Sequence, residues 1–284
     1  MVSIEDYGDY ETEWCPGCGN FAILKAIKQA LTNLGKAPHE VLIASGIGQS
    51  SKLPHYLKCN VFNGLHGRSL PPAIGAKIAN HELTVLAVAG DGDCYGEGGN
   101  HFIHNVRRNP DITLIVHDNQ IYGLTKGQAS PTSELGMKTK IQNHGVFNTP
   151  LNPLAMAISL DCSFVSRGYA GDVPHLTELI EKAINHRGFS LVDVLQPCVS
   201  FNKLNTFKWY SERVYKMDEG EYPLDERVRA FERSLEWGEK IPLGIFYEKD
   251  KPVFGDHLDV LKSGPLVKGK PETEKINELI DGFI

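Results

Sequence analysis

The sequence predicts an α/β fold built on a mainly parallel sheet with helices on both faces. Three apolar runs, Leu83–Ala89, Ile112–Val116 and Phe189–Leu195, have the length and continuous hydrophobicity of strands that are buried on both sides. Segments of helical length separate such runs along the chain. Alternating strands and helices of this kind form parallel sheets, because each crossover helix returns the chain to the same end of the sheet.

The predicted elements follow one another without an internal repeat or a low-complexity segment. In the first helix, apolar side chains recur at helical spacing, and Gly35 is placed to end it. In order, we expect helix 21–34, strand 41–44, a helix starting near residue 70, strand 83–89, helix 96–108, strand 112–116, a long loop 119–152, a weak strand 163–166, helix 173–186 and strand 189–195. Beyond residue 199, aromatic side chains are scattered among charges without this alternation. We therefore expect a domain over residues 1–198 and a C-terminal extension over residues 199–284 that packs on the core or on a partner.

The composition is that of an ordinary soluble globular protein, with 41% hydrophobic and 23% charged residues. A net charge of −6, without a run of Lys or Arg, argues against a nucleic-acid-binding surface. No apolar stretch approaches the ~18 residues that span a membrane, and the acidic N-terminus is unlike a signal peptide. We expect a cytoplasmic protein with no membrane partner, whose six cysteines are thiols or metal ligands rather than disulfides.

Two polar motifs follow neighbouring strands of the predicted sheet. GDGD occupies residues 90–93, DNQIYG occupies residues 118–123, and 26 residues separate Gly92 from Asn119. Ligands of open α/β sheets bind at the carboxyl ends of strands, and oxygen ligands suit a Mg²⁺ ion that bridges to a diphosphate. This spacing is the thiamine diphosphate signature, in which Asp91, the Asn119 side chain and the Ile121 carbonyl would hold Mg²⁺. The alternative is a glycine-rich turn that binds nothing.

The cysteines form a second candidate site. Cys15 and Cys18 are spaced as a short chelating pair, which suits a redox dithiol, half a zinc site or half an iron–sulfur site. Cys198 follows a strand and is expected at the same edge of the sheet as the diphosphate motifs. This proximity favours an electron-accepting cluster over a remote zinc site. For Cys94 and Cys162, we expect small core residues.

Together these motifs resemble the β subunit of the 2-oxoacid:ferredoxin oxidoreductases. The resemblance covers about residues 12–200 and rests on five motifs in one order: CPGCG at 15–19, LHGR at 65–68, GDGD at 90–93, GGNH at 98–101 and NQIYGLTKGQ at 119–128. It implies a thiamine-diphosphate fold of the diphosphate-binding type over residues 1–198, with a 4Fe–4S cluster. The implied reaction is CoA-dependent oxidative decarboxylation of a 2-oxoacid, with electrons passed to ferredoxin.

The resemblance also implies roles for individual residues. Lys52 and Leu124 match positions associated with substrate recognition, and His66 matches a catalytic position near the cofactor. The implied cofactor-binding residues are Asp91, Gly92, Asp93, Asn119, Ile121, Gly123 and His66.

The cluster ligands depart from the family pattern at one position. Cys15, Cys18 and Cys198 match three cluster cysteines, but Gln49 stands where the family usually has the third in chain order. Glutamine is a poor ligand in a site that requires thiolates. We expect Cys59 to replace the missing ligand; the alternatives are a labile cluster or none.

The resemblance further implies an obligate partner. Thiamine enzymes need a glutamate from a pyrimidine-binding domain, and this chain is long enough for only one domain of that kind. An α subunit is expected to supply the glutamate and the coenzyme A site. As substrate we favour 2-oxoglutarate, with pyruvate next. Two other functions stay open: a non-oxidative thiamine diphosphate decarboxylase or synthase subunit, and a zinc-stapled nucleotide-binding module without catalysis.

Overall fold

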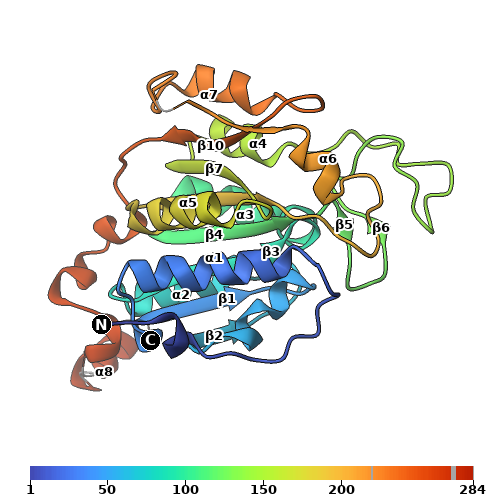
Figure 1. Cartoon of the computed structure of the whole chain (residues 1–284). Coiled ribbons are helices and arrows are strands. Elements are labelled where there is room, and N and C mark those ends of the chain that lie inside the picture. The colour runs from blue at the N-terminus through green and yellow to red at the C-terminus, as the bar shows by residue number, and fades with distance from the viewer. Residues whose placement is uncertain (219, 270–272, 284) are drawn as a thin grey trace.

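An eight-stranded sheet forms the centre of the molecule (Figure 1). The computed structural model describes residues 1–218, 220–269 and 273–283. The strand order is β2-β1-β3-β4-β8-β7-β10-β9, and a separate two-stranded hairpin is formed by β5 and β6. The strands are β1 (Val41–Ser45), β2 (Asn60–Asn63), β3 (Thr84–Gly90), β4 (Ile112–Asp118), β5 (Ile121–Tyr122), β6 (Gln128–Ala129), β7 (Phe164–Tyr169), β8 (Phe189–Leu195), β9 (Val214–Lys216) and β10 (Ile241–Glu248).

The sheet is parallel except where β10 runs antiparallel to β7. In its middle, Val88 of β3 pairs with Ile115 of β4, and Ile115 pairs with Val192 of β8. All three side chains are fully buried, as expected of strands covered on both faces. The predicted α/β class with a mainly parallel sheet is confirmed.

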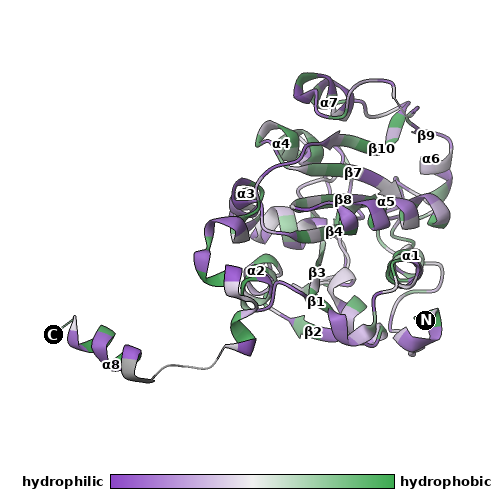
Figure 2. Cartoon of the chain, turned by 90° about the vertical axis from the view of Figure 1, so that its left-hand side faces the viewer, coloured by the Kyte–Doolittle hydropathy of each residue, from purple (hydrophilic) through white to green (hydrophobic). Residues whose placement is uncertain are grey.

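Helices cover both faces of the sheet, and the apolar strands lie between them (Figure 2). Helices α1 and α5 pack on one face, and α2, α3 and α4 pack on the other. No helix in the described ranges is long and apolar enough to cross a bilayer. The α-helices are α1 (Asn20–Asn33), α2 (Leu70–Ala79), α3 (Gly99–Arg108), α4 (Pro153–Ser159), α5 (Val173–Asn185), α6 (Phe207–Ser211), α7 (Arg227–Ser234) and α8 (Thr273–Asp281).

Short helical turns complete the chain. A π-helical turn, η4 (Gly92–Glu97), precedes α3, so the helix predicted from residue 96 is divided in two. The 3-10 turns are η1 (Ile4–Tyr7), η2 (Pro38–Glu40), η3 (Ser50–Tyr56), η5 (Phe254–His257), η6 (Asp259–Ser263) and η7 (Leu266–Lys268).

The segment after residue 199 differs from the prediction. Strands β9 and β10 extend the central sheet, so the expectation that strand–helix alternation stops there is wrong. The pattern of β10 is hidden because Pro242 and Gly244 interrupt it, and because the register shifts between Ile245 and Tyr247. The division into a domain over 1–198 and an extension over 199–284 stays a prediction.

His117 of β4 ties helix α1 to the sheet. Its imidazole is fully buried, and its Nδ1 lies 2.8 Å from Asn20 Oδ1 in the first turn of α1. Burial disfavours the imidazolium form and lowers the pKa of His117 to about 3. His117 is therefore neutral in the folded chain, whereas in the unfolded chain it titrates near its ordinary pKa of about 6.5.

The depressed pKa of His117 predicts a loss of stability in mild acid. Below about pH 6.5 the unfolded chain takes up a proton that the folded chain does not, so the contribution present above that pH is lost as the pH falls. At about pH 5 this lowers the free energy of unfolding by about 2 kcal/mol. Urea denaturation should show the stability gap between wild type and His117→Gln shrinking by that amount from about pH 7.5 to pH 5. A gap that stays constant with pH would contradict the lowered pKa.

Candidate functional site

A small cavity of about 60 Å³ lies at the carboxyl ends of β3 and β4. Four segments that are distant in the sequence line it. They contribute Ile47, Gly48, Gln49, Ser50, His66, Gly90, Asp91, Gly92, Asp93, Asn119, Ile121, Tyr122, Gly123, Leu124 and Thr125. Because β3 and β4 are parallel neighbours, the polar residues that follow both strands meet at one edge. The structure thus brings together every residue predicted to bind the cofactor.

Asp91 is held by two hydroxyl groups from the loop that follows β6. Ser130 Oγ donates to Asp91 Oδ2 at 2.5 Å, and Thr132 Oγ1 donates to the same oxygen at 2.6 Å. The side chain is buried, and burial raises the pKa of Asp91 against the opposing effect of these hydrogen bonds. Thr132 also lies 2.8 Å from Asp118 Oδ1, so this one hydroxyl joins two carboxyl groups.

Two further buried carboxyl groups lie near this edge of the sheet, on β4 and β8. Asp118 and Asp193 are almost inaccessible, and burial, followed by their mutual repulsion and that of Asp91, raises the pKa of Asp118 well above its usual range. Burial raises the pKa of Asp193 to about 6, while Arg167 opposes this rise. Carboxylates are costly to bury without counter-charge, and Arg167 is a single cation among three acids. A divalent cation at Asp91 would offset this excess of negative charge.

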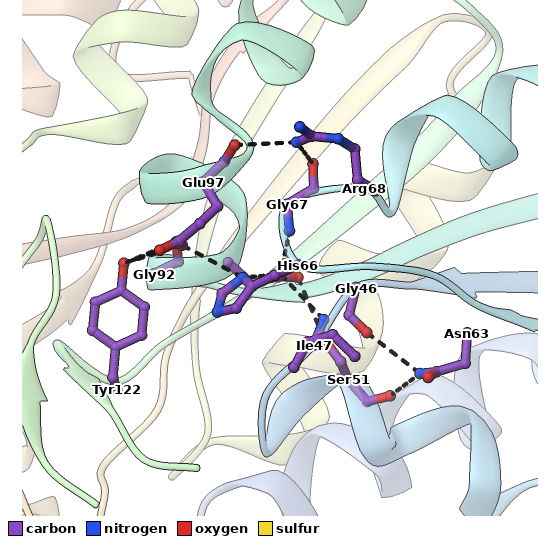
Figure 3. A network of polar contacts seen from close by, with 11 residues as sticks. Gly46, Ile47, Ser51, Asn63, His66, Gly67, Arg68, Gly92, Glu97 and Tyr122 are labelled. Atoms are coloured by element: carbon purple, nitrogen blue, oxygen red, sulfur yellow. Dashed lines mark hydrogen bonds and ion pairs between the residues drawn. The ribbon is translucent and has the colours of Figure 1, made fainter. Parts of the chain in front are cut away.

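Asp93 organises the other wall of the cavity, and three residues that it contacts, Ile47, His66 and Gly67, are labelled in Figure 3. Its Oδ1 accepts from the backbone N–H groups of Gly67 at 2.6 Å and Ile47 at 3.1 Å, and it lies 2.7 Å from His66 Nδ1. Only glycine fits at residue 46, because a Cβ there would lie 1.9 Å from Asp93 Oδ2. The carboxylate therefore fixes His66 and two loops around the cavity.

Asn119 presents its carboxamide between the cavity and β8. Asn119 Oδ1 accepts from the backbone N–H of Ile121 at 3.0 Å, which leaves this oxygen a second lone pair. Asn119 Nδ2 donates to Gln196 Oε1 at 3.1 Å. Asp91, Asn119 and the Ile121 carbonyl are all oxygen donors of the type that Mg²⁺ prefers, so the donor set fits a Mg²⁺–diphosphate group.

Tyr122 closes the cavity from the loop side. Its hydroxyl lies 3.1 Å from Glu97 Oε2 and 3.3 Å from the Gly92 carbonyl oxygen. Added Cβ atoms would lie 2.3 Å from its ring at Gly92 and 2.5 Å from its hydroxyl at Gly96, so Tyr122 packs directly against both glycines. Figure 3 shows Tyr122, Glu97 and His66 side by side.

Of the two predicted substrate-recognition residues, Leu124 lines the cavity and is 41% exposed. Lys52 lies in η3, two residues beyond the lining residue Ser50, and does not itself line the cavity.

Three of the four predicted cluster cysteines lie at this edge of the sheet. The turn containing Cys15 and Cys18 contacts the turn after β8, where Gly19 N donates to Pro197 O at 3.5 Å. Burial raises the pKa of Cys18 to about 11, and the nearby Cys198 and Cys15 thiolates contribute to the rise. Within the described ranges, no three His, Cys, Asp or Glu side chains are close enough together to hold a metal ion.

The structure does not bring Cys59 to the other three cysteines. Lys58 N donates to Tyr7 O at 2.8 Å, and Tyr7 Oη donates to the carbonyl of Lys36, which follows the C-terminal end of α1. Cys18 precedes the N-terminal end of the same 14-residue helix, which is about 21 Å long. A site with these four thiolates therefore does not fit this fold.

Gln49 stands near the cofactor cavity instead. Gln49 lines the cavity, and its buried Oε1 has no hydrogen-bond partner among the residues that the structure describes. Its backbone carbonyl accepts from Trp14 Nε1 at 2.7 Å, next to Cys15.

Sequence reasoning missed several residues of the site. Ser130 and Thr132 lie in the long segment predicted as loop, about 40 residues from Asp91 in the chain, and no local pattern indicates that they bond to it. Glu97 and Gln196 are likewise visible only in the folded chain. The SPT sequence that follows the NQIYGLTKGQ motif is the single signal that could have pointed to the hydroxyl groups.

Comparisons with known protein families and proteins agree with this geometry. Residues 41–194 match the thiamine pyrophosphate enzyme C-terminal TPP binding domain, and residues 198–263 match the C-terminal family of the pyruvate ferredoxin oxidoreductase beta subunit. A 2-oxoacid:ferredoxin oxidoreductase subunit beta of Saccharolobus solfataricus is 49% identical over 84% of this chain and 82% of its own. The 2-oxoglutarate synthase subunit KorB of Methanocaldococcus jannaschii is 34% identical over 87% of this chain and 92% of its own.

A solved structure extends the match to nearly the whole chain. The 2-oxoglutarate:ferredoxin oxidoreductase of Magnetococcus marinus, with 2-oxoglutarate, coenzyme A and succinyl-CoA bound, superposes with a TM-score of 0.90 at 33% identity. The alignment covers 98% of this chain and 96% of that one. These likenesses select an oxidoreductase over the two alternatives that the residues alone left open. The chain belongs to the β subunits of the 2-oxoacid:ferredoxin oxidoreductases, which work as multisubunit enzymes.

Proposed function

We propose that this β subunit binds thiamine diphosphate through Mg²⁺ at the cavity and, with a partner subunit, oxidises a 2-oxoacid to acyl-CoA and CO₂. The observation that carries the proposal is the convergence of Asp91, Asn119 and Ile121 at one edge of the sheet. Among 2-oxoacids we favour 2-oxoglutarate, with pyruvate next, because several relatives carry 2-oxoglutarate in their names. Ferredoxin is the proposed electron acceptor.

The chain's own residues hold and orient the cofactor in this proposal. The Asp91 carboxylate, Asn119 Oδ1 and the Ile121 carbonyl would hold Mg²⁺. When bound, thiamine diphosphate supplies the electron sink that decarboxylation of a 2-oxoacid requires. His66, fixed by Asp93, is placed to move a proton at the cavity wall.

The segment from Asn119 to Thr125 contributes most of the cavity lining that follows β4, and its Tyr122 ring packs against Gly92. A bound diphosphate would therefore contact this segment.

The proposed site depends on a second polypeptide for its remaining parts. An α subunit would supply two parts of the site: the glutamate that faces the aminopyrimidine ring, and the residues that bind coenzyme A. We have proposed no residue of this chain for either role. The thiols of Cys15, Cys18 and Cys198 lie at the same edge as the cavity, so a redox centre that they came together to bind would be close to the cofactor. We place the complex in the cytoplasm, where such thiols stay reduced.

Loss of the Asp91 carboxylate should abolish Mg²⁺-dependent binding of thiamine diphosphate to the complex with the partner subunit. Thr132→Val should weaken it about tenfold, because the valine cannot hold Asp91 in place, and Thr132→Ser should restore it. Calorimetric titration measures these affinities, with Asp91→Ala as the null variant and the exposed Asp259→Ala as control. Wild-type affinity in Asp91→Ala would remove the proposed metal site.

Lys52→Ala should raise the KM for 2-oxoglutarate more than that for pyruvate. A lysine ammonium can pair with the second carboxylate of 2-oxoglutarate, a group that pyruvate lacks. Steady-state kinetics on both substrates measure the ratio of kcat/KM, and Lys58→Ala in the following segment is the control. An equal effect on both substrates would exclude Lys52 from substrate selection.

Cys59→Ala should leave the iron and sulfide content of the anaerobically purified complex unchanged. The reason is the separation of Cys59 from the other three cysteines by the length of α1. Cys198→Ser is expected to lose iron, since Cys198 lies beside Cys18. Loss of iron from Cys59→Ala would restore Cys59 as a ligand.

A further inference from the structure

One side chain, Gln196, joins the cofactor cavity to the cysteine turn. Gln196 directly follows β8 and is 1% exposed. Its Oε1 accepts from Asn119 Nδ2 at 3.1 Å. Its Nε2 donates to the carbonyl oxygen of Pro197 at 2.8 Å and lies 3.5 Å from Cys18 Sγ. The same carboxamide therefore touches a proposed Mg²⁺ ligand on one side and a thiol on the other.

These contacts determine which way Gln196 and Asn119 face. Nε2 is the only donor of the Gln196 carboxamide, and the Pro197 carbonyl can only accept, so Oε1 must point toward Asn119. Asn119 must then turn its own NH₂ group toward Gln196. Its Oδ1 is left on the opposite side, where it meets the Ile121 N–H and lines the cavity. A flipped Asn119 would present N–H groups to the metal and to Ile121.

Close packing keeps Gln196 in this orientation. A Cβ at residue 19 would lie 2.9 Å from Gln196 Cγ and 3.1 Å from its Nε2. Gly19 lies between Cys18 and the first residue of α1, and Gln196 N donates to Asp118 O at 2.9 Å. Gln196 therefore packs between the cysteine turn and the end of β4, and these contacts restrict the orientation of its carboxamide.

We propose that Gln196 is a positioning residue that keeps Asn119 Oδ1 available to Mg²⁺, and that its contact with Cys18 Sγ helps to hold its carboxamide in this orientation. This inference rests on the proposed binding of Mg²⁺ and thiamine diphosphate. A side chain that orients a metal ligand affects the affinity for the metal without touching it.

The first test replaces the carboxamide with a side chain of similar size that holds neither bond. In the complex with the partner subunit, Gln196→Met should weaken thiamine diphosphate binding about tenfold at low Mg²⁺ and much less at saturating Mg²⁺. Adding Asn119→Asp should restore binding at low Mg²⁺, because both terminal atoms of aspartate are oxygens and its orientation no longer matters. If Gln196→Met fails to fold, Gly19→Ala is the second variant. Its added Cβ would displace Gln196, so it should also weaken thiamine diphosphate binding at low Mg²⁺.

The second test is a double-mutant cycle on the same calorimetric readout. Cys18→Ala should weaken binding when Gln196 is present and have no further effect beside Gln196→Met. Cys15→Ala is the matched control, because Cys15 Sγ accepts from Ser200 and not from Gln196, so its effect should be the same in both backgrounds.

The outcomes separate this inference from the proposed function. Equal losses at low and saturating Mg²⁺, or no rescue by Asn119→Asp, would overturn the positioning role. Additive effects of Cys18→Ala and Gln196→Met would show that Cys18 does not hold Gln196 in place, and would overturn that part of the inference. Failure of the wild-type complex to bind thiamine diphosphate with Mg²⁺ would instead refute the proposed function itself.

Discussion

The parallel pairing of β3, β4 and β8 is the constraint on which the site depends. Three parallel neighbours must end at the same edge, so the residues that follow Gly90, Asp118 and Leu195 are brought together whatever the distance between them in the sequence. Asp91, Asn119 and Gln196 all occupy such positions. Helices packed on both faces hold these strand ends still, and the loops can then supply ligands at a fixed place (Figure 1).

This convergence has an electrostatic cost. Asp91, Asp118 and Asp193 are buried close together, and burial raises the pKa of each. Arg167, whose guanidinium also stacks 5.4 Å from the centre of the Trp237 ring, offsets only part of the charge. A fold that keeps such a group of acids is destabilised by them when no cation is bound. A metal ion that binds only the native state would raise the free energy of unfolding and offset this destabilisation. The buried carboxyl groups that destabilise the empty fold would thus promote binding of the cation.

The thiol region and the cofactor cavity are in contact through both polar and apolar side chains. Gln196 contacts both, Gln49 reaches from the Trp14 segment to the cavity, and Cys198 packs in the same apolar cluster as Ile121. Both regions lie at one edge of the sheet, whereas Cys59 lies near the other end of α1.

The sequence by itself determined the fold class, and it located Asp91 and Asn119 directly after two neighbouring parallel strands, so that they line one cavity. These follow from local information: strand hydrophobicity, helical periodicity, and polar residues directly after strands. Only the tertiary structure decided the contacts of Thr132 with Asp91, the orientation of Asn119 by Gln196, and the separation of Cys59 from Cys18. These contacts join segments tens of residues apart, and packing rather than local pattern sets which of them meet. The sequence pattern did not reveal β10 for a related reason. Its register on β7 shifts between Ile245 and Tyr247, so its side chains do not alternate regularly along the strand.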